Sequence, residues 1–304
     1  MEGIINVLKP PGMTSHDVIY WIRKNINIKK AGHTGTLDPG AAGVLPVCIG
    51  KATKIIPYIN ENKKVYRAKI VFGEITDTQD KYGQVLKKSN PDFTISQLYK
   101  AFNAFTGKIK QKPSIYSAIK VKGKRLYDYA RQGQGDLVDI PIREVYIYNI
   151  KLIYHKIPEY AFIEVECSKG TYIRTLCSDI GDFLGCGAHM GFLLRTSTGD
   201  FNLKTSITLE EIEIKNKKNH IEDILLPLDY SLNPYPKIYI KESAKKSLIN
   251  GNSIYPQGII TDLKKFNTDS IVTTYINNKL SAIGKIQYDN DNDRYYFKSL
   301  RVLL

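Results

Sequence analysis

The chain has 304 residues, 42% of them hydrophobic, and its 44 Lys and Arg outnumber its 30 Asp and Glu. This length and apolar content suit one large domain or two ordinary ones. The formal net charge of +14 suggests a polyanionic partner, because each phosphate that a Lys or Arg neutralises releases condensed counterions. A basic surface that serves only solubility would give the same charge, but the 21 tyrosines favour nucleic acid, since aromatic rings stack on unpaired bases.

Four cysteines at irregular spacings, without a CxxC pair, argue against a zinc knuckle or a disulfide framework and for a reducing compartment. The five histidines show no metal-ligand spacing. The N-terminus has no basic stretch followed by an apolar core, and no apolar run is long enough to span a membrane. We therefore expect a cytoplasmic protein that needs neither a metal nor a membrane.

Apolar periodicity and turn residues predict the elements of the first 80 residues. In chain order they are a strand at 3–8, a helix from the N-cap hydroxyls of Thr14 or Ser15 to residue 27, a glycine-rich loop at 32–46, a strand at 44–49, a short helix at 52–59, a strand at 64–72 and a polar turn at 76–80.

The glycine-rich loop has the sequence GHTGTLDPGAAGVLP, with four glycines, two prolines and a single carboxylate, Asp38. Its backbone must turn sharply and approach another group closely. Asp38 precedes Pro39, which biases its backbone away from the helical region. A stiff loop of this kind can present a reactive carboxylate, but an aspartate in a Gly/Pro loop can also serve only as the cap of a tight turn.

The same signals continue through the middle of the chain. We expect a helix that opens with the capping box Thr94–Gln97 and ends by residue 107, a short strand within 113–122, a helix at 125–132, a polar loop at 133–139, a hairpin of strands at 143–154 and 161–167, a helix at 171–184 and a strand at 192–195. A second capping box, Thr208–Glu211, opens a further helix.

Three prolines within 226–236 mark a boundary, and the basic, strand-like stretch after it suits a small β appendage. Strands and helices alternate without regular βαβ spacing, which predicts an α+β fold with a mixed or antiparallel sheet. The sequence contains no phosphate loop, GxSxG elbow, HExxH or Rossmann fingerprint, so it indicates no nucleotide or metal cofactor.

Five ordered segments carry a resemblance to one family. They are KPPGMTS at 9–15, GHTGTLDPGAAGVLPV at 32–47, KVYRAKIVFGEITDTQD at 64–80, QKPSIYSAIKVKGKRLYDYARQG at 111–133 and CSKGTYIRTLCSDIGDFLGCGAH at 167–189. Together they resemble the bacterial TruB family of tRNA pseudouridine synthases over about residues 3–233, and the glycine loop and KGTYIRTL are the most specific parts.

The resemblance implies the pseudouridine synthase fold, with a central sheet flanked by helices in a catalytic domain at 1–233. It implies an enzyme that converts uridine at position 55 in the tRNA T-arm to pseudouridine, without a cofactor or protein partners. We also expect a small PUA-like domain at 237–304 that binds RNA, from its position and length.

Carried over by position, Asp38 falls on the family's catalytic aspartate, Arg174 on its active-site arginine and Tyr66 on its active-site tyrosine. Cleavage of a glycosidic bond needs a carboxylate that attacks or stabilises an electron-deficient sugar carbon. A guanidinium beside Asp38 would keep that carboxylate ionised and oriented. Tyr66 would stack on the target base and take a proton late in the reaction. On residue type alone, Arg174 could equally bind phosphate and Tyr66 could belong to the core.

Four further positions match family motifs. Leu193 corresponds to the apolar residue on the other side of the base, and His33 to a histidine that helps to hold flipped nucleotides, since a uridine in a folded loop must be flipped out to react. Asp80 and Lys9 can be assigned only as orienting or loop-supporting residues. Without the resemblance, Leu193 would be interpreted as a residue of the hydrophobic core and His33 as a structural residue.

The basic run that begins at Lys120 suits the tRNA backbone, although a solvated basic face would look the same; its members are Lys120, Lys122, Lys124 and Arg125. Two other functions stay open. The chain could be a tRNA-binding or tRNA-folding module without essential catalysis, or a subunit of a guide-RNA-dependent enzyme. Ser114 stands where many family members have a second proline, and the stretch from residue 237 matches weakly.

Overall fold

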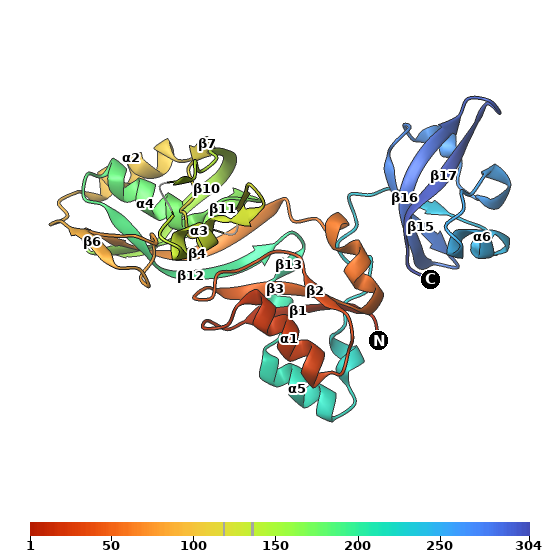
Figure 1. The fold of residues 1–304 in the computed structure, drawn as a ribbon, viewed down its shortest axis with the longest axis horizontal. Coiled ribbons are helices and arrows are strands. Elements are labelled where there is room, and N and C mark those ends of the chain that lie inside the picture. The colour runs from red at the N-terminus through yellow and green to blue at the C-terminus, as the bar shows by residue number, and fades with distance from the viewer. Residues whose placement is uncertain (118, 135–136) are drawn as a thin grey trace.

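The computed structural model describes residues 1–117, 119–134 and 137–304, so parts of the strand expected within 113–122 and of the loop expected at 133–139 lie outside the described residues. A large mixed sheet with flanking helices occupies most of the chain, and a smaller sheet, blue in Figure 1, stands to one side of it. The structure therefore has the α+β architecture that the sequence predicts.

The large sheet has nine strands within the described residues, and its main path runs β1-β3-β12-β4-β11-β10-β7, with β2 on β3 and β13 on β12. The pairing of β12 with β3 is parallel and the others are antiparallel, as expected for a mixed sheet. The strands are β1 Gly3–Lys9, β2 Ala31–His33, β3 Ala42–Ile49, β4 Lys63–Phe72, β7 Gly107–Gln111, β10 Arg143–Lys156, β11 Tyr160–Ser168, β12 Ala188–Thr198 and β13 Phe201–Asn202.

Capping explains where three helices begin. The side chains of Thr14, Thr94 and Thr208 each accept a hydrogen bond from the backbone N–H of the third helical residue. The side chain of that residue accepts in turn from the backbone N–H of the threonine, so all three form capping boxes. Two of these boxes are the ones that the sequence predicts. The α-helices are α1 Ser15–Asn25, α2 Ile95–Ala104, α3 Leu126–Arg131, α4 Ile173–Phe183, α5 Leu209–Lys217 and α6 Lys245–Ile249.

Two clusters of the hydrophobic core determine where the glycine-rich loop lies. One lies under α4 and α2 and includes residues of β4, β11 and β12; the other lies between α1 and the inward faces of β1 and β3. The hydrophobic stripe of α1 packs there through Val18, Ile19 and Ile22. The edge of β3 against β12 therefore joins the two packed halves, and the glycine-rich loop leads into it.

Some elements differ from expectation. The helix predicted at 52–59 is a 3-10 helix, Gly50–Tyr58, with Pro57 inside it. The strand predicted at 192–195 extends over the whole of β12, because it pairs with β4 from end to end. Strands β2, β7 and β13, the pair β5 Glu74–Thr76 with β6 Val85–Lys88, and β9 Lys124–Arg125 were not predicted. These strands are only two to five residues long, which leaves little periodic signal. The partner of β9, β8 Lys120–Val121, lies within the stretch 113–122 where a short strand was expected.

The C-terminal sheet has four strands among the described residues, in the order β14-β15-β16-β17, and it has its own hydrophobic core. Its strands are β14 Lys237–Tyr239, β15 Ile271–Ile276, β16 Lys279–Asp289 and β17 Arg294–Val302. It also contacts the rest of the chain: the Tyr275 hydroxyl donates to Asp229 at 2.9 Å, and Ile283 and Leu303 share a cluster with Ile55.

Two findings bear on the expected location. Among the described residues, no helix is long and apolar enough to cross a membrane. The four cysteines are buried and free, and burial raises the pKa of Cys48 and of Cys167 to about 12. A thiolate nucleophile at either position is therefore disfavoured at neutral pH. The expectation of a cytoplasmic protein stays a prediction.

Gly43 is where the close approach of two strands demands a glycine. Its φ is +119°, and a Cβ built there would lie 2.2 Å from the carbonyl oxygen of Arg195 on β12. Gly43→Ala should lower the free energy of unfolding in urea by about 3 kcal/mol, from backbone strain and overpacking together. Gly107→Ala is the matched control, since Gly107 has φ +98° but no atom within 4 Å of the added Cβ. Equal losses in the two variants would contradict the packing argument.

Candidate active site

The loop that carries Asp38 is held from beneath by a buried lysine. Lys9, fully buried at the end of β1, points its ammonium group at three backbone carbonyls. It donates to Pro10 at 2.9 Å, to Pro39 at 3.2 Å and to Ala41 at 2.7 Å. Pro39 and Ala41 lie one and three residues after Asp38, so the ammonium group of Lys9 holds the backbone of the loop on that side of Asp38.

The residues after Lys9 complete this support. The backbone N–H of Leu37 donates to the Ser15 hydroxyl at 2.9 Å, and that hydroxyl donates back to the Leu37 carbonyl at 3.2 Å. The N–H of Gly12 donates to the Pro39 carbonyl at 2.8 Å. The backbone is thus fixed on both sides of Asp38, which gives the KPPGMTS segment a structural purpose.

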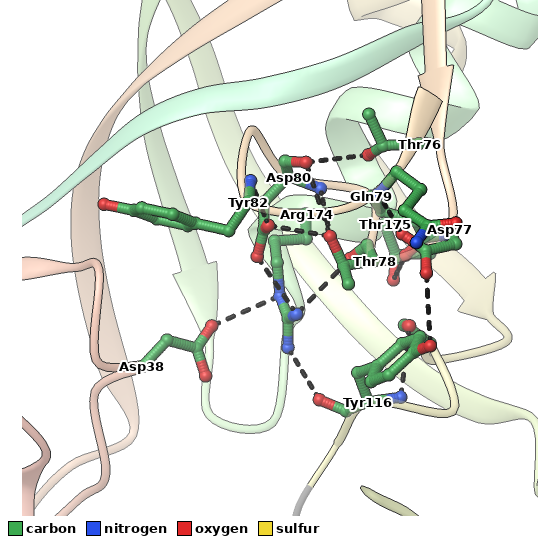
Figure 2. A network of polar contacts seen from close by, with 12 residues as sticks. Asp38, Thr76, Asp77, Thr78, Gln79, Asp80, Tyr82, Tyr116, Arg174 and Thr175 are labelled. Carbon is green, nitrogen blue, oxygen red and sulfur yellow. Dashed lines mark hydrogen bonds and ion pairs between the residues drawn. The ribbon is translucent and has the colours of Figure 1, made fainter. Parts of the chain in front are cut away.

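Arg174 is the centre of the polar network shown in Figure 2. It is the second residue of α4, and its side chain is only 7% exposed. Its Nε lies 3.2 Å from Asp38 Oδ2, and its Nη1 lies 3.3 Å from Asp80 Oδ2. The same guanidinium donates to the carbonyls of Thr78 at 3.3 Å and Tyr116 at 3.1 Å. One buried cation therefore faces two carboxylates, and only Asp38, with 44% of its side chain exposed, is open to a ligand.

Asp80 is oriented by its own turn. Its carboxylate accepts from the Thr78 hydroxyl at 2.7 Å and from the Tyr82 backbone N–H at 3.0 Å. The Thr76 hydroxyl donates to the Asp80 carbonyl at 2.7 Å. These bonds hold the polar turn TDTQD so that the carboxylate points at Arg174, which makes Asp80 an orienting residue (Figure 2).

Asp38, Tyr66, Arg174 and Leu193 line one cavity of about 180 Å³. A second cavity, of about 450 Å³, shares Asp38, Arg174 and Leu193 with it. The further lining residues of the first are Thr36, Leu37, Lys64, Ser117, Gly170, Thr171, Tyr172 and Ile173. Four residues from distant parts of the sequence thus meet around a single hollow, which one carboxylate, two cations and apolar side chains line.

Tyr66 lies in the middle of β4 and is 8% exposed. Burial raises the pKa of its phenol, and the charge of Arg195 opposes this rise. Tyr66 is therefore a neutral phenol at physiological pH. The alternation of β4 places Arg67 on the opposite face, where it pairs with Glu164 at 2.9 Å, as the strand pattern predicts.

His33 and Lys120 are placed elsewhere. Among the described residues that line the two cavities, neither is present. His33 is half-buried on β2, edge-to-face with His16 at 5.7 Å between ring centroids, and burial lowers the pKa of its imidazole. Lys120 is exposed on the β8–β9 hairpin, just before α3, whose Arg131 lines the larger cavity.

Two buried cations of the site were missed from the sequence. Lys64 lines the smaller cavity. Arg195 is fully buried and donates through Nε to the Val44 carbonyl at 2.8 Å and through Nη2 to the Gly35 carbonyl at 3.0 Å, at the two ends of the glycine loop. A signal was present: each lies two residues from a predicted site residue on the same strand, and alternation places such pairs on one face.

A carboxylate that a buried guanidinium orients, beside a phenol and an apolar wall, can attack or stabilise an electron-poor carbon. Among the described residues, no three His, Cys, Asp or Glu side chains gather as metal ligands. The expectation that the chain needs no cofactor stays a prediction.

The whole chain resembles solved structures of this architecture. A structure of an H/ACA RNP bound to a substrate RNA containing 2'-deoxyuridine matches with TM-score 0.74 and 26% identity, over 99% of this chain and 85% of that one. A Cbf5-Nop10-Gar1 complex matches with TM-score 0.73 and 28% identity, over the same shares. The fold and the enzyme class are those of a pseudouridine synthase.

Comparison with protein families then identifies the family to which the chain belongs. Residues 23–173 match the model of the TruB family pseudouridylate synthase N-terminal domain, and residues 174–233 match the tRNA pseudouridylate synthase B C-terminal domain. The tRNA pseudouridine synthase B of Alkaliphilus oremlandii is 46% identical over 303 residues, covering 100% of this chain and 99% of that protein. The one from Clostridioides difficile is 44% identical, over 96% of each. The chain belongs to the TruB family and is an isomerase.

The pKa of Lys9 makes its role testable. Burial lowers that pKa from 10.5 to about 8, so between these values the unfolded chain binds the proton and the folded chain does not. The contribution of Lys9 to folding therefore becomes more favourable as the pH rises through this window. Lys9→Met leaves three carbonyls without their donor and should cost about 1–3 kcal/mol.

In urea unfolding, the gap in stability between wild type and Lys9→Met should widen from below pH 8 to near pH 10.5. Comparing the two proteins at each pH cancels the titration of all other groups. A gap that is the same at both pH values would show that Lys9 does not titrate in this range.

Proposed function

We propose that the chain isomerises uridine at position 55, in the T-arm of tRNA, to pseudouridine, with Asp38 as the catalytic carboxylate. The observation that carries this proposal is the contact of Asp38 with the buried Arg174 at 3.2 Å, beside a cavity that Tyr66 and Leu193 also line. The tRNA substrate follows from the names of the relatives, which are tRNA pseudouridine synthases B over the full length of the chain.

The reaction breaks the bond between N1 of uracil and C1' of the ribose and joins C1' to C5 of the same base. A uridine inside a folded loop must leave the stack to reach Asp38. In the cavity, Asp38 acts on C1', either as a nucleophile or as an anion that stabilises the electron-deficient carbon. Arg174 holds the carboxylate ready for this step, because its own position is determined by Asp80 and two carbonyls.

The other predicted residues take roles around this step. Tyr66 stacks on the base, and Leu193 covers the opposite side. To take a proton late in the reaction, as the resemblance implies, the neutral phenol of Tyr66 must first lose its own proton. His33, outside the cavity, contacts the RNA next to the flipped nucleotide. Lys120, exposed on its hairpin, contacts the tRNA backbone, which accounts for part of the net positive charge.

The separate C-terminal sheet gives the chain a second RNA-binding part. We assign residues 1–233 to the catalytic domain and 237–304 to a small PUA-like domain that binds tRNA away from the T-loop. The stretch from Lys237 has eleven Lys and Arg against six Asp and Glu, which suits a phosphate backbone.

A function without chemistry, as a tRNA-binding or tRNA-folding module, is the alternative. Pure binding of a polyanion gains nothing from an exposed carboxylate that a buried arginine keeps in place, so the site favours catalysis. The solved structures with a similar fold contain partner proteins, whereas the curated relatives are named as tRNA enzymes. We therefore propose that the chain acts without a partner protein.

Asp38→Asn tests the catalytic assignment. The substitution keeps the shape of the side chain but removes the charge, so pseudouridine formation should fall below detection while tRNA affinity changes less than about tenfold. The assay incubates the purified protein with an unmodified T-arm hairpin and maps pseudouridine in the product.

Asp223→Asn, at an exposed ion pair with Lys215, is the control and should keep full activity. Full activity of Asp38→Asn would refute the mechanism. A wild-type protein that binds the hairpin without modifying it would favour the binding module, and product at another uridine would change the substrate assignment.

Arg174→Lys should lower kcat/KM about 100-fold, because a lysine cannot reach Asp38, Asp80 and two carbonyls at once. The control is Arg67→Lys, at the exposed pair with Glu164 on the same sheet, which should stay within twofold of wild type. Both variants are measured by steady-state pseudouridine formation on the T-arm hairpin. Comparable rates for Arg174→Lys and Arg67→Lys would show that the network is not needed for catalysis.

A further inference from the structure

Lys64 brings a positive charge into the same cavity as Asp38. It precedes Tyr66 by two residues on β4, so the two side chains leave the strand on the same face, and both line the smaller cavity. The side chain of Lys64 is 11% exposed. The strand neighbour Lys63 lies on the opposite face, with 57% of its side chain exposed, and pairs there with Glu166.

The ammonium group of Lys64 is only partly satisfied by its surroundings. Glu61, just before β4, accepts from it at 3.4 Å and itself accepts from the Thr34 hydroxyl. A lysine has three N–H donors, and within the described part of the chain this long bond to Glu61 uses one of them, which leaves two for a ligand. Gly35 permits the approach, because a Cβ at that position would lie 2.9 Å from the Lys64 nitrogen.

The charges around Lys64 leave this end of the cavity positive. Arg195 on β12 is the register partner of Tyr66 on β4, and its Nη1 is buried without a partner among the described residues. Lys64 and Arg195 together carry two positive charges, and Glu61 supplies one negative charge. His33 on β2 and Cys167 on β11 also face this group of charges.

We propose that Lys64 is a further catalytic residue, which donates a hydrogen bond to a carbonyl oxygen of the target uracil as the base separates from the ribose. This role rests on the proposed function. When the N1–C1' bond breaks, its electron pair stays on the base and spreads over N1 and the two carbonyl oxygens. A charged donor placed where this negative charge develops, and itself largely shielded from solvent, stabilises the transition state more than the ground state.

The atoms and charges of this step balance without a co-reactant. C5 then forms the new bond to C1' and loses its proton, and N1 gains one, so the base regains neutrality. Lys64 stays protonated throughout. The carboxylate of Asp38 serves the electron-poor sugar, while Lys64 serves the electron-rich base, and the cavity holds both.

Lys64→Met tests this assignment, because it keeps the length of the side chain and removes the charge. We expect kcat for pseudouridine formation on the T-arm hairpin to fall about 100-fold, with the Kd for the hairpin within about threefold of wild type. The matched control is Lys63→Met, which changes the total charge equally and should leave kcat unchanged. A kcat of Lys64→Met within threefold of wild type would overturn the proposal.

The pH profile of kcat gives a second test that a structural role would not move. Burial lowers the pKa of Lys64, and Glu61 opposes this. Loss of the Lys64 proton should therefore make kcat fall at alkaline pH. Glu61→Gln should move this alkaline limb of the profile to lower pH. In Lys64→Arg, whose charge persists, the limb should disappear. An alkaline limb that is identical in wild type, Glu61→Gln and Lys64→Arg would overturn the proposal, even if Lys64→Met fails to fold.

These outcomes separate the two proposals. If wild type forms no pseudouridine on the hairpin, the proposed function fails. If wild type is active and Asp38→Asn is inactive while Lys64→Met is unimpaired, the proposed function stands and the role of Lys64 alone is refuted.

Discussion

One buried guanidinium, that of Arg174, connects segments that are far apart in the chain. It contacts the loop of Asp38, the turn of Asp80 and the backbone at Tyr116, all from the first turn of α4. Burying a cation is costly unless its donors are used, and here two carboxylates and two carbonyls use them. The position of the Asp38 carboxylate therefore depends on how these distant segments pack around Arg174. The side chain of Gln111 adds to this by bonding both the N–H and the carbonyl of Tyr172, where α4 begins.

The glycine loop depends on two further buried cations. Lys9 holds its middle through Pro39 and Ala41, and Arg195 holds its two ends. The glycines serve this arrangement. At all four glycines of the loop, an added Cβ would meet another part of the protein: the side chain of Ile56 at Gly32, Lys64 and Glu61 at Gly35, the ring of Tyr82 at Gly40 and the Arg195 backbone at Gly43. The loop is thus packed against its supports on several sides, while the Asp38 carboxylate stays accessible.

The family motifs acquire distinct physical roles from these contacts. The KPPGMTS segment supports the loop, and TDTQD presents Asp80. The segment from Gln111 positions α4 and supplies the carbonyl of Tyr116, and the YIRTL segment supplies Arg174. All four act on the orientation of Asp38. The structure brings Asp38, Tyr66, Arg174 and Leu193 together around one cavity, whereas His33 and Lys120 lie outside it.

The sequence by itself determined much of the local structure of this protein: two of its three capping boxes, most long strands, the stiff loop at Asp38 and the α+β class. These features depend on neighbours within a few residues, and such signals are visible in one chain. Only the tertiary structure decided which side chains share a cavity. It placed Lys64 and Arg195 beside Tyr66 and joined β12 to β4 from end to end. Burial of a charge is decided by carbonyls and carboxylates from distant segments, and no local pattern records where those will meet.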